Sequence, residues 1–232
     1  IVMLPPVRSA LAFAAAVMHK ASRVGASRVG VVMGTTTSSI AASEAAYRQL
    51  DAQGRPPAAL CVNDLHHLGA IGHFVQRALE VTGPVMTVST ACSSSAKAFA
   101  VAQRWLAMNV CDAVVVGGAD SLCGSVLHGF ASLQLVSNEP CRPFDAQRRG
   151  ISLGEAGAFA LLVRHADAPD DAVRLLGVGE SSDAHHLTAP QPDGASIEAA
   201  LRGALAQAGI APNDVDYVNL HGTATPQNDA VE

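Results

Sequence analysis

The sequence has few charged residues and no cluster of one sign. Aspartate, glutamate, lysine and arginine make up 15% of the 232 residues, and the formal net charge is −5. Proteins that bind nucleic acid or an anionic membrane surface present grouped lysine and arginine side chains. Because this chain has no such group, we expect neither partner.

A long apolar run is also missing. The apolar stretch at residues 11–18 is too short to span a bilayer, which takes about 20 residues, and it lacks the flanks of a signal peptide. We expect a buried helix there and no membrane insertion. Apolar residues make up 49% of the chain, which is ample for a large hydrophobic core.

Cysteines at metal-binding or redox spacing are absent. The five cysteines are odd in number, scattered and never spaced as C-x-x-C: Cys61, Cys92, Cys111, Cys123 and Cys141. This spacing argues against a disulfide framework and against a zinc site, and it favours a reducing compartment, the cytoplasm. We interpret all of them except Cys92 as packing residues.

Helix-like and strand-like segments alternate along the chain, which predicts an α/β fold. Helical spacing covers residues 96–108 and 195–208, and Gly209 is the expected end of the second helix. A polar, proline-containing connector at 166–171 separates two predicted halves, 1–166 and 173–232. The predicted strands are residues 29–34, 85–89, 112–118, 158–163, 173–178 and 215–220.

Cys92 lies where a predicted strand becomes a predicted helix. The positive end of a helix stabilises a thiolate, which is the nucleophilic form of cysteine. The alternative is a buried packing residue, since a free cysteine often behaves as a small hydrophobe. Three serines follow it directly, at 93–95, and serines contribute little to a core. The sequence therefore favours Cys92 as a nucleophile.

His221 follows the last predicted strand, at the edge of the sheet where α/β folds place ligand-binding residues. Gly222 permits unusual backbone angles, and Thr223 and Thr225 offer hydroxyl groups. The alternative is a structural histidine. A thiolate and a histidine, one in each half, suit acyl transfer through a thioester. The adjacent pairs at 66–67 and 185–186 make no metal site alone, because neighbouring side chains diverge.

Three segments together carry a family resemblance. Residues 87–95 (TVSTACSSS), 141–157 and 221–232 (HGTATPQNDAVE) resemble the β-ketoacyl-acyl carrier protein synthases, the condensing enzymes of fatty acid and polyketide assembly. The resemblance implies a decarboxylative Claisen condensation that lengthens an acyl thioester by two carbons. Residues 89–95 and 141–158 are most similar to the discrete ketosynthases of aryl-polyene pathways.

The resemblance also implies roles for single residues. Cys92 would take the acyl chain from the phosphopantetheine arm of acyl carrier protein, and its backbone N–H would contribute to the oxyanion hole. His221 would be the first of two active-site histidines and assist decarboxylation of the malonyl extender. Thr223 and Thr225 would contact substrate, and so would Phe130, whose alternative is a core aromatic.

Two further segments match the family without a catalytic assignment. Asp229 and Glu232 correspond to acidic positions that lie near an active-site lysine in the family. Residues 142–145 (RPFD) form a rigid corner, and we interpret its arginine and aspartate as tying down a loop.

The fold implied by the resemblance is thiolase-like, with two similar α/β halves in a five-layered αβαβα arrangement, incomplete at both ends of this chain. The second histidine, the lysine and a glycine-rich loop lie outside residues 1–232, so we expect this segment not to be an independently active unit. The family condenses without a metal or dissociable redox cofactor. Its partners are acyl carrier protein and a second subunit, in a homodimer or a heterodimer.

The chain departs from the family at a few positions, and other functions compete. His185, Ala224 and residues 147–150 differ from the usual pattern, which affects substrate identity more than activity. Thiolases and coenzyme A-dependent starter synthases share the fold, but the sequence at 221–229 argues against both. A catalytically silent partner of the chain-length-factor kind is the alternative from another class, and such partners generally lack the cysteine.

Overall fold

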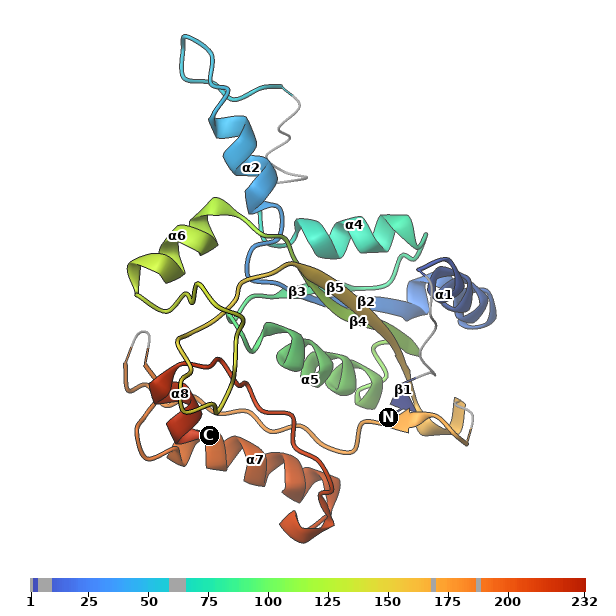
Figure 1. Cartoon of the computed structure of the whole chain (residues 1–232). Helices are drawn as coiled ribbons and strands as arrows, with labels where there is room; N and C mark the ends of the chain where they lie inside the picture. Colours follow the sequence, from blue (N-terminus) through green and yellow to red (C-terminus); the bar gives the residue numbers. More distant parts are fainter. Residues whose placement is uncertain (1, 4–9, 59–65, 168–169, 187–188) are drawn as a thin grey trace. The chain divides into compact units, whose positions relative to one another are not determined.

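The computed structural model describes residues 2–3, 10–58, 66–167, 170–186 and 189–232, which form two compact units (Figure 1). The first unit comprises Ile1–Gly124 and Glu155–Leu175, and the second comprises Ser125–Gly154 and Leu176–Glu232. Both units are therefore built from two separate stretches of chain, whereas the predicted halves are each continuous.

The first unit is built on one six-stranded sheet in the order β3-β2-β4-β5-β1-β6. β2, β3 and β4 are parallel, and β5 runs antiparallel to β4. The four predicted strands between residues 29 and 163 are confirmed. The strands are β1 (Val2–Met3), β2 (Val29–Gly34), β3 (Val85–Val88), β4 (Ala113–Asp120), β5 (Ala156–Val163) and β6 (Val173–Arg174).

Helices cover both faces of this sheet, which explains why its central strands are apolar throughout. Val29, Val31 and Met33 of β2 pack with α1 (Ala10–Val24) and α4 (Ala70–Ala78). Val32, on the opposite face of the same strand, packs with α5 (Ser94–Ala107). Figure 1 shows α1 and α4 on one side of the strands and α5 on the other.

The helix at the start of the chain differs from its prediction. Residues 11–18 belong to the longer helix α1, and within residues 12–24 only Val17 is fully buried. Met18 is 50% exposed. One side of the helix packs on the sheet and the rest is partly or fully exposed. The expectation of a buried helix was therefore wrong for most of the helix surface. The first unit also contains α2 (Ile40–Tyr47), η1 (Ala26–Arg28) and η2 (His165–Asp167).

The described residues of the second unit form helices and loops. α6 (Gly124–Ser132) leads into it, and α7 (Ala195–Ala208), η3 (Pro212–Asp214) and α8 (Pro226–Val231) follow. The prediction for residues 195–208 is confirmed, and Gly209 ends α7 in the left-handed conformation.

Two predicted strands are not formed as expected. Of residues 173–178, only Val173 and Arg174 form a strand, and it joins the sheet of the first unit. Residues 215–220 form no strand, and Tyr217 and Val218 are 79% and 57% exposed. The alternating sequence pattern is present, but a strand exists only when a neighbour takes up its backbone hydrogen bonds. None of the described residues supplies that neighbour.

Candidate active site

Cys92 lies at the junction that the sequence predicted, between β3 and α5. It precedes Ser93, the N-cap residue of α5, and its side chain is exposed. Ala91 has a φ of 53°, a left-handed conformation that costs a residue with a side chain on the order of 1–2 kcal/mol. The chain therefore makes a tight, strained turn directly before the cysteine, which presents the thiol at the start of the helix.

Two glycines let the start of α5 approach the sheet. A Cβ atom on Gly34, the last residue of β2, would lie 2.6 Å from the backbone carbon of Ser94. A Cβ on Gly118 of β4 would lie 2.2 Å from the hydroxyl of Ser95. Real Cβ atoms do not come so close to other atoms, so glycine is required at Gly34, where the close atoms are backbone, whereas at Gly118 the Ser95 hydroxyl would have to rotate away. The position of the Cys92 turn is thus set by the ends of two neighbouring parallel strands.

Asp120, at the end of β4, organises the loop that follows β2. Its Oδ1 accepts hydrogen bonds from the backbone N–H groups of Thr36 and Thr37, at 2.8 and 2.7 Å, and from the hydroxyls of Thr35 and Thr37, at 2.6 and 2.9 Å. Burial alone would raise the pKa of Asp120, but hydrogen bonds from Thr35, Thr37 and Thr36 outweigh it and hold that pKa below its usual value. Asp120 is therefore a carboxylate at neutral pH.

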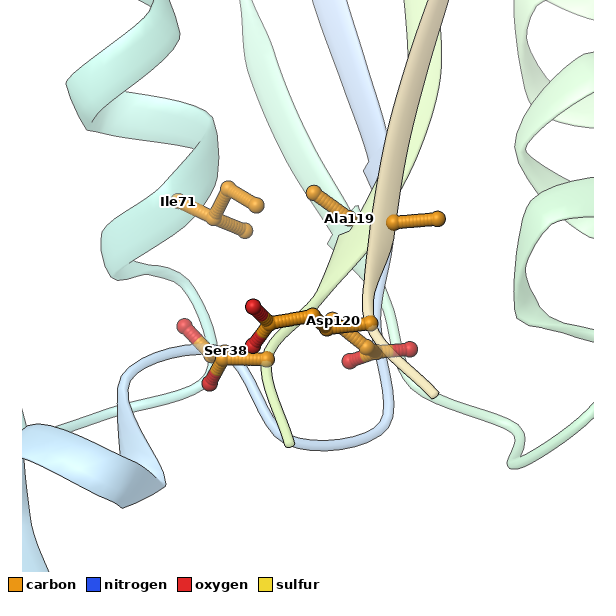
Figure 2. A pocket seen from close by; sticks show the side chains of 7 residues that line it. Ser38, Ile71, Ala119 and Asp120 are labelled. Carbon is orange, nitrogen blue, oxygen red and sulfur yellow. The ribbon is translucent and has the colours of Figure 1, made fainter. Parts of the chain in front are cut away.

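An open pocket of about 480 Å³ lies beside this loop, on the side of the sheet that carries α4. In Figure 2, Ile71 and Ala119 lie at one end of the pocket, and Asp120 and Ser38 lie together at the other. Glu155, also in the lining, accepts a hydrogen bond from the backbone N–H of Leu122 at 3.1 Å. The lining residues are Ser38, Ile71, Ala119, Asp120, Ser121, Glu155 and Ala156.

The loop that carries His221 is held by two carboxylates from the end of the chain. The side chain of Glu232 accepts hydrogen bonds from the backbone N–H groups of His221 and Gly222, at 2.8 and 2.9 Å. Asp229, on α8, accepts one from the N–H of Ala224 at 3.1 Å. His221 itself is exposed. Since both carboxylates bind backbone N–H groups, they fix the path of the loop that carries the imidazole.

The corner at residues 141–150 supports the same loop from another side. Asp229 also accepts a hydrogen bond from the N–H of Phe144 at 2.8 Å, and Arg148 lies 3.4 Å from that oxygen as an ion pair. Gly150 donates its N–H to the carbonyl of Ala224 at 2.9 Å. Gly222 has a φ of 55°, as its position after the histidine predicted.

The contacts of the corner at residues 142–145 fit the structural role that the sequence predicted. The backbone N–H of Asp145 bonds to the carbonyl of Arg142, but the two side chains do not pair with each other. Arg142 pairs with Glu139 at 2.8 Å instead. The corner ties down a loop through Asp229, which the sequence interpretation did not include.

The remaining predicted site residues lie in the second unit with His221. The hydroxyls of Thr223 and Thr225 lie 2.8 Å apart and bond to each other, and Thr225 is buried. Phe130 is half-buried on α6. Contact of these three residues with substrate stays a prediction. Cys92, the predicted nucleophile, belongs to the first unit, so Cys92 and His221 are each described within their own unit.

The other cysteines fit packing or lie outside the described residues. Cys111 and Cys123 are buried, and burial raises the pKa of the Cys111 thiol. Cys141 is half-buried, and its thiol lies 3.7 Å from the carbonyl of Thr223. Cys61 lies outside the described residues. Within those residues, no group of three or more His, Cys, Asp or Glu side chains is placed to hold a metal ion.

The sequence did not reveal that Asp120 holds the loop after β2, or that Asp229 and Glu232 bind the backbone of the His221 loop. A signal for Asp120 was present, because it is an acidic residue at the carboxyl end of an apolar strand. The contacts of Asp229 and Glu232 had no local signal, since each carboxylate binds amides that become neighbours only after the loop has folded. Among the helices that the structure describes, none is both long enough and apolar enough to cross a membrane.

Family models match both parts of the chain. The model for the N-terminal domain of β-ketoacyl synthases matches residues 3–168, and the model for the C-terminal domain matches residues 173–232. Nodulation protein E of Rhizobium meliloti (strain 1021) is 36% identical over 210 residues, which cover 88% of this chain and 52% of that protein. The 3-oxoacyl-[acyl-carrier-protein] synthase 2 of the same strain is 37% identical over 158 residues, which cover 63% of this chain and 38% of that protein.

Solved structures show the same fold. A ketosynthase from Xenorhabdus doucetiae, determined in complex with its chain length factor, superposes with a TM-score of 0.82 and 40% identity over 94% of this chain and 55% of that one. A β-ketoacyl synthase from Burkholderia phymatum superposes with a TM-score of 0.79 and 28% sequence identity, over 90% of this chain and 53% of that one. The fold is the thiolase-like fold of these synthases, and the chain spans about half the length of the curated relatives it matches.

Proposed function

Because the chain belongs to the β-ketoacyl synthase family, we propose that it carries the acyl-accepting cysteine, Cys92, and one catalytic histidine, His221, of a condensing enzyme. The proposed reaction extends an acyl thioester by two carbons at the expense of malonyl-acyl carrier protein. Both substrates arrive on the phosphopantetheine arm of acyl carrier protein. The proposed chemistry needs no metal or dissociable redox cofactor, and we place it in the cytoplasm, where thiols stay reduced.

The first half-reaction loads Cys92. Its thiolate attacks the carbonyl carbon of the acyl thioester, and the tetrahedral intermediate expels the sulfur of the phosphopantetheine arm as a thiolate, which takes up a proton from water. The acyl chain is then joined to the cysteine sulfur. A backbone N–H at the start of α5, that of Cys92 itself, is the proposed donor to the developing oxyanion.

The second half-reaction uses His221. The carbon–carbon bond to the malonyl carboxylate breaks, carbon dioxide leaves, and the electron pair stays on the thioester as an enolate. Hydrogen bonding from the imidazole to the thioester oxygen stabilises that negative charge. The enolate carbon attacks the acyl group on Cys92 and releases the cysteine as thiolate. The product is a β-ketoacyl thioester on the carrier.

One observation carries the proposal. Cys92 is an exposed thiol that a strained turn at Ala91 presents one residue before the N-cap of α5. A cysteine that only packed the core would be buried, as Cys111 and Cys123 are. The same observation argues against a chain-length-factor-like partner, because such a subunit needs no nucleophile at this turn.

The proposal includes a second subunit. β3 is an edge strand that pairs with β2 alone among the described strands, and Met86 within it is 41% exposed. An edge strand with apolar side chains is a ready site for pairing with another chain. The Xenorhabdus relative was determined with its chain length factor. We therefore propose a homodimer or a heterodimer with a related subunit, whose contact includes this edge.

Intact-mass measurement of the whole protein tests the function. After incubation with a panel of acyl carrier thioesters, the protein should gain the mass of one acyl group, and peptide mapping should place that group on Cys92. Cys92→Ser should gain nothing and should not condense, since an alcohol is a far weaker nucleophile than a thiolate. Acylation that persists in Cys92→Ser would exclude the proposed role.

A further inference from the structure

We propose that Ser94 is a positioning residue for the nucleophile: its buried hydroxyl locks the turn that presents Cys92. The inference rests on the proposed function, because it concerns how that thiol is held. Ser94 is the first residue of α5 and is only 3% exposed. Its neighbours in the sequence, Ser93 and Ser95, are exposed. One serine of the three is therefore buried.

The Ser94 hydroxyl bonds to the backbone on both sides of the residue that precedes Cys92. It accepts a hydrogen bond from the N–H of Thr90 at 2.9 Å and lies 2.6 Å from the carbonyl of Ala91, to which it donates. These two bonds span Ala91, whose φ of 53° is unfavourable for a residue with a Cβ. The carbonyl of Ala91 belongs to the same peptide unit as the N–H of Cys92, so the hydroxyl fixes the orientation of that unit.

Fixing this peptide unit has a direct chemical consequence. The proposed oxyanion donor is the N–H of Cys92, and the direction of the thiol depends on the same backbone. Hydrogen-bond donors and nucleophiles work only within narrow limits of distance and angle. A hydroxyl that holds the Ala91 carbonyl therefore acts on Cys92 without touching a substrate.

The inward hydroxyl is itself part of a larger bonded network. Ser94 Oγ lies 3.4 Å from the carbonyl of Thr35, and the hydroxyl of Thr35 bonds to Asp120. Asp120 is anchored at the end of β4 and remains a carboxylate. The turn before Cys92 is thus braced against β2 and β4 through Ser94, whereas Ser93 bonds only to Thr90 within the same turn.

The test compares Ser94→Ala with Ser94→Thr and with Ser95→Ala in the whole protein. The readout is the rate at which iodoacetamide alkylates Cys92 as a function of pH, measured without substrate, together with the temperature of unfolding. Ser94→Ala should slow alkylation at neutral pH about tenfold and move the pH profile upward, because the thiol is no longer held at the helix start. Ser94→Thr keeps the hydroxyl and should restore most of the rate.

The outcomes separate this inference from the proposed function. A wild-type alkylation profile in Ser94→Ala would overturn the inference, and so would an equal shift in the exposed control Ser95→Ala. Should the threonine variant unfold, the comparison of the two alanine variants still decides, provided both unfold near the wild-type temperature. Acyl loading that persists in Cys92→Ser counts against the proposed function alone, because the alkylation profile is measured without any thioester.

Discussion

Glu232 binds the backbone of His221, the proposed catalytic histidine, since its carboxylate accepts hydrogen bonds from the N–H groups of His221 and Gly222 at 2.8 and 2.9 Å. The amide of Asn228 donates a third bond to the same carboxylate, at 3.1 Å. The loop around His221 has no strand partner of its own among the described residues. A histidine that stabilises a charge developing on a substrate has to be held in position, and these hydrogen bonds hold it.

Glu232→Ala should therefore impair the step that uses His221 more than the step that uses Cys92. We expect malonyl decarboxylation to fall about tenfold or more, since each charge-assisted hydrogen bond lost contributes roughly 1.5–3 kcal/mol. Loading of Cys92 should stay within about twofold. Glu232→Gln retains one acceptor oxygen, so its rate of malonyl decarboxylation should lie between those of the wild type and Glu232→Ala. Equal losses in both half-reactions would contradict a role confined to the histidine loop.

Among the cysteines that the structure describes, Cys92 should react first with an alkylating reagent. Its side chain is exposed, whereas Cys111 and Cys123 are buried, and burial raises the pKa of Cys111. Only thiolates react appreciably, so burial slows alkylation twice, through access and through ionisation. Limited treatment with iodoacetamide followed by peptide mapping checks the order, and preferential labelling of a buried cysteine would refute it.

Gly34→Ala should displace the start of α5. The added methyl group would lie 2.6 Å from the backbone of Ser94, and backbone cannot rotate away as a side chain can. We expect a loss of roughly 1–3 kcal/mol in the free energy of unfolding, together with slower alkylation of Cys92.

Gly129→Ala is the matched control for this substitution. Gly129 lies in α6, and a Cβ there would have no neighbour within 4 Å, so alanine should be neutral or stabilising by up to about 1 kcal/mol. Chemical unfolding of both variants provides the comparison. Similar behaviour of the two would show that contact with α5 is not what requires glycine at position 34.

Local signals predicted much of the fold. The bounds of β2 and α7 follow from an apolar run closed by Gly34 and from helical spacing ended by Gly209, and both elements occur at the predicted residues. The Cys92 junction was predictable for the same reason, because a β-branched run and a helical pattern meet there. In each case the deciding interactions lie within a few residues along the chain.

The rest depends on neighbours that are distant in sequence. Residues 215–220 have a strand pattern, but no described strand pairs with them. The clamps by Asp229 and Glu232 join amides to carboxylates across a folded loop. Ser94 looks like the serines beside it until the helix fixes which one is buried. Such features follow from tertiary contacts, which composition and periodicity do not encode.

Asp112 should make stability depend on pH in the acid range. It precedes β4 and pairs with Arg28, at 2.7 Å, and with Arg164, which follows β5. Hydrogen bonds from Arg28 and then Arg164 hold the pKa of Asp112 far below its usual range. A carboxylate with a depressed pKa in the folded state stabilises fully above its unfolded pKa, about 3.9, and loses this contribution as pH falls further.

Asp112→Asn should thus lower the free energy of unfolding at neutral pH, by roughly 1–3 kcal/mol, and the gap to wild type should narrow below about pH 4. Denaturant unfolding at several pH values measures the gap. Glu198→Gln serves as control, because Glu198 forms an exposed pair with Arg202 on α7, and its loss should cost at most about 0.5 kcal/mol. A gap that stays constant down to pH 2 would contradict the role of Asp112.

The central claim is that Cys92 and His221 divide one condensation between them, and separate measurement of the two half-reactions in His221→Ala of the whole protein tests it most directly. Acyl transfer to Cys92 is followed by intact mass, and decarboxylation of malonyl-acyl carrier protein by release of carbon dioxide. We predict that the variant still acquires the acyl group on Cys92 but no longer decarboxylates malonyl carrier protein. Loss of loading with decarboxylation intact would contradict the account.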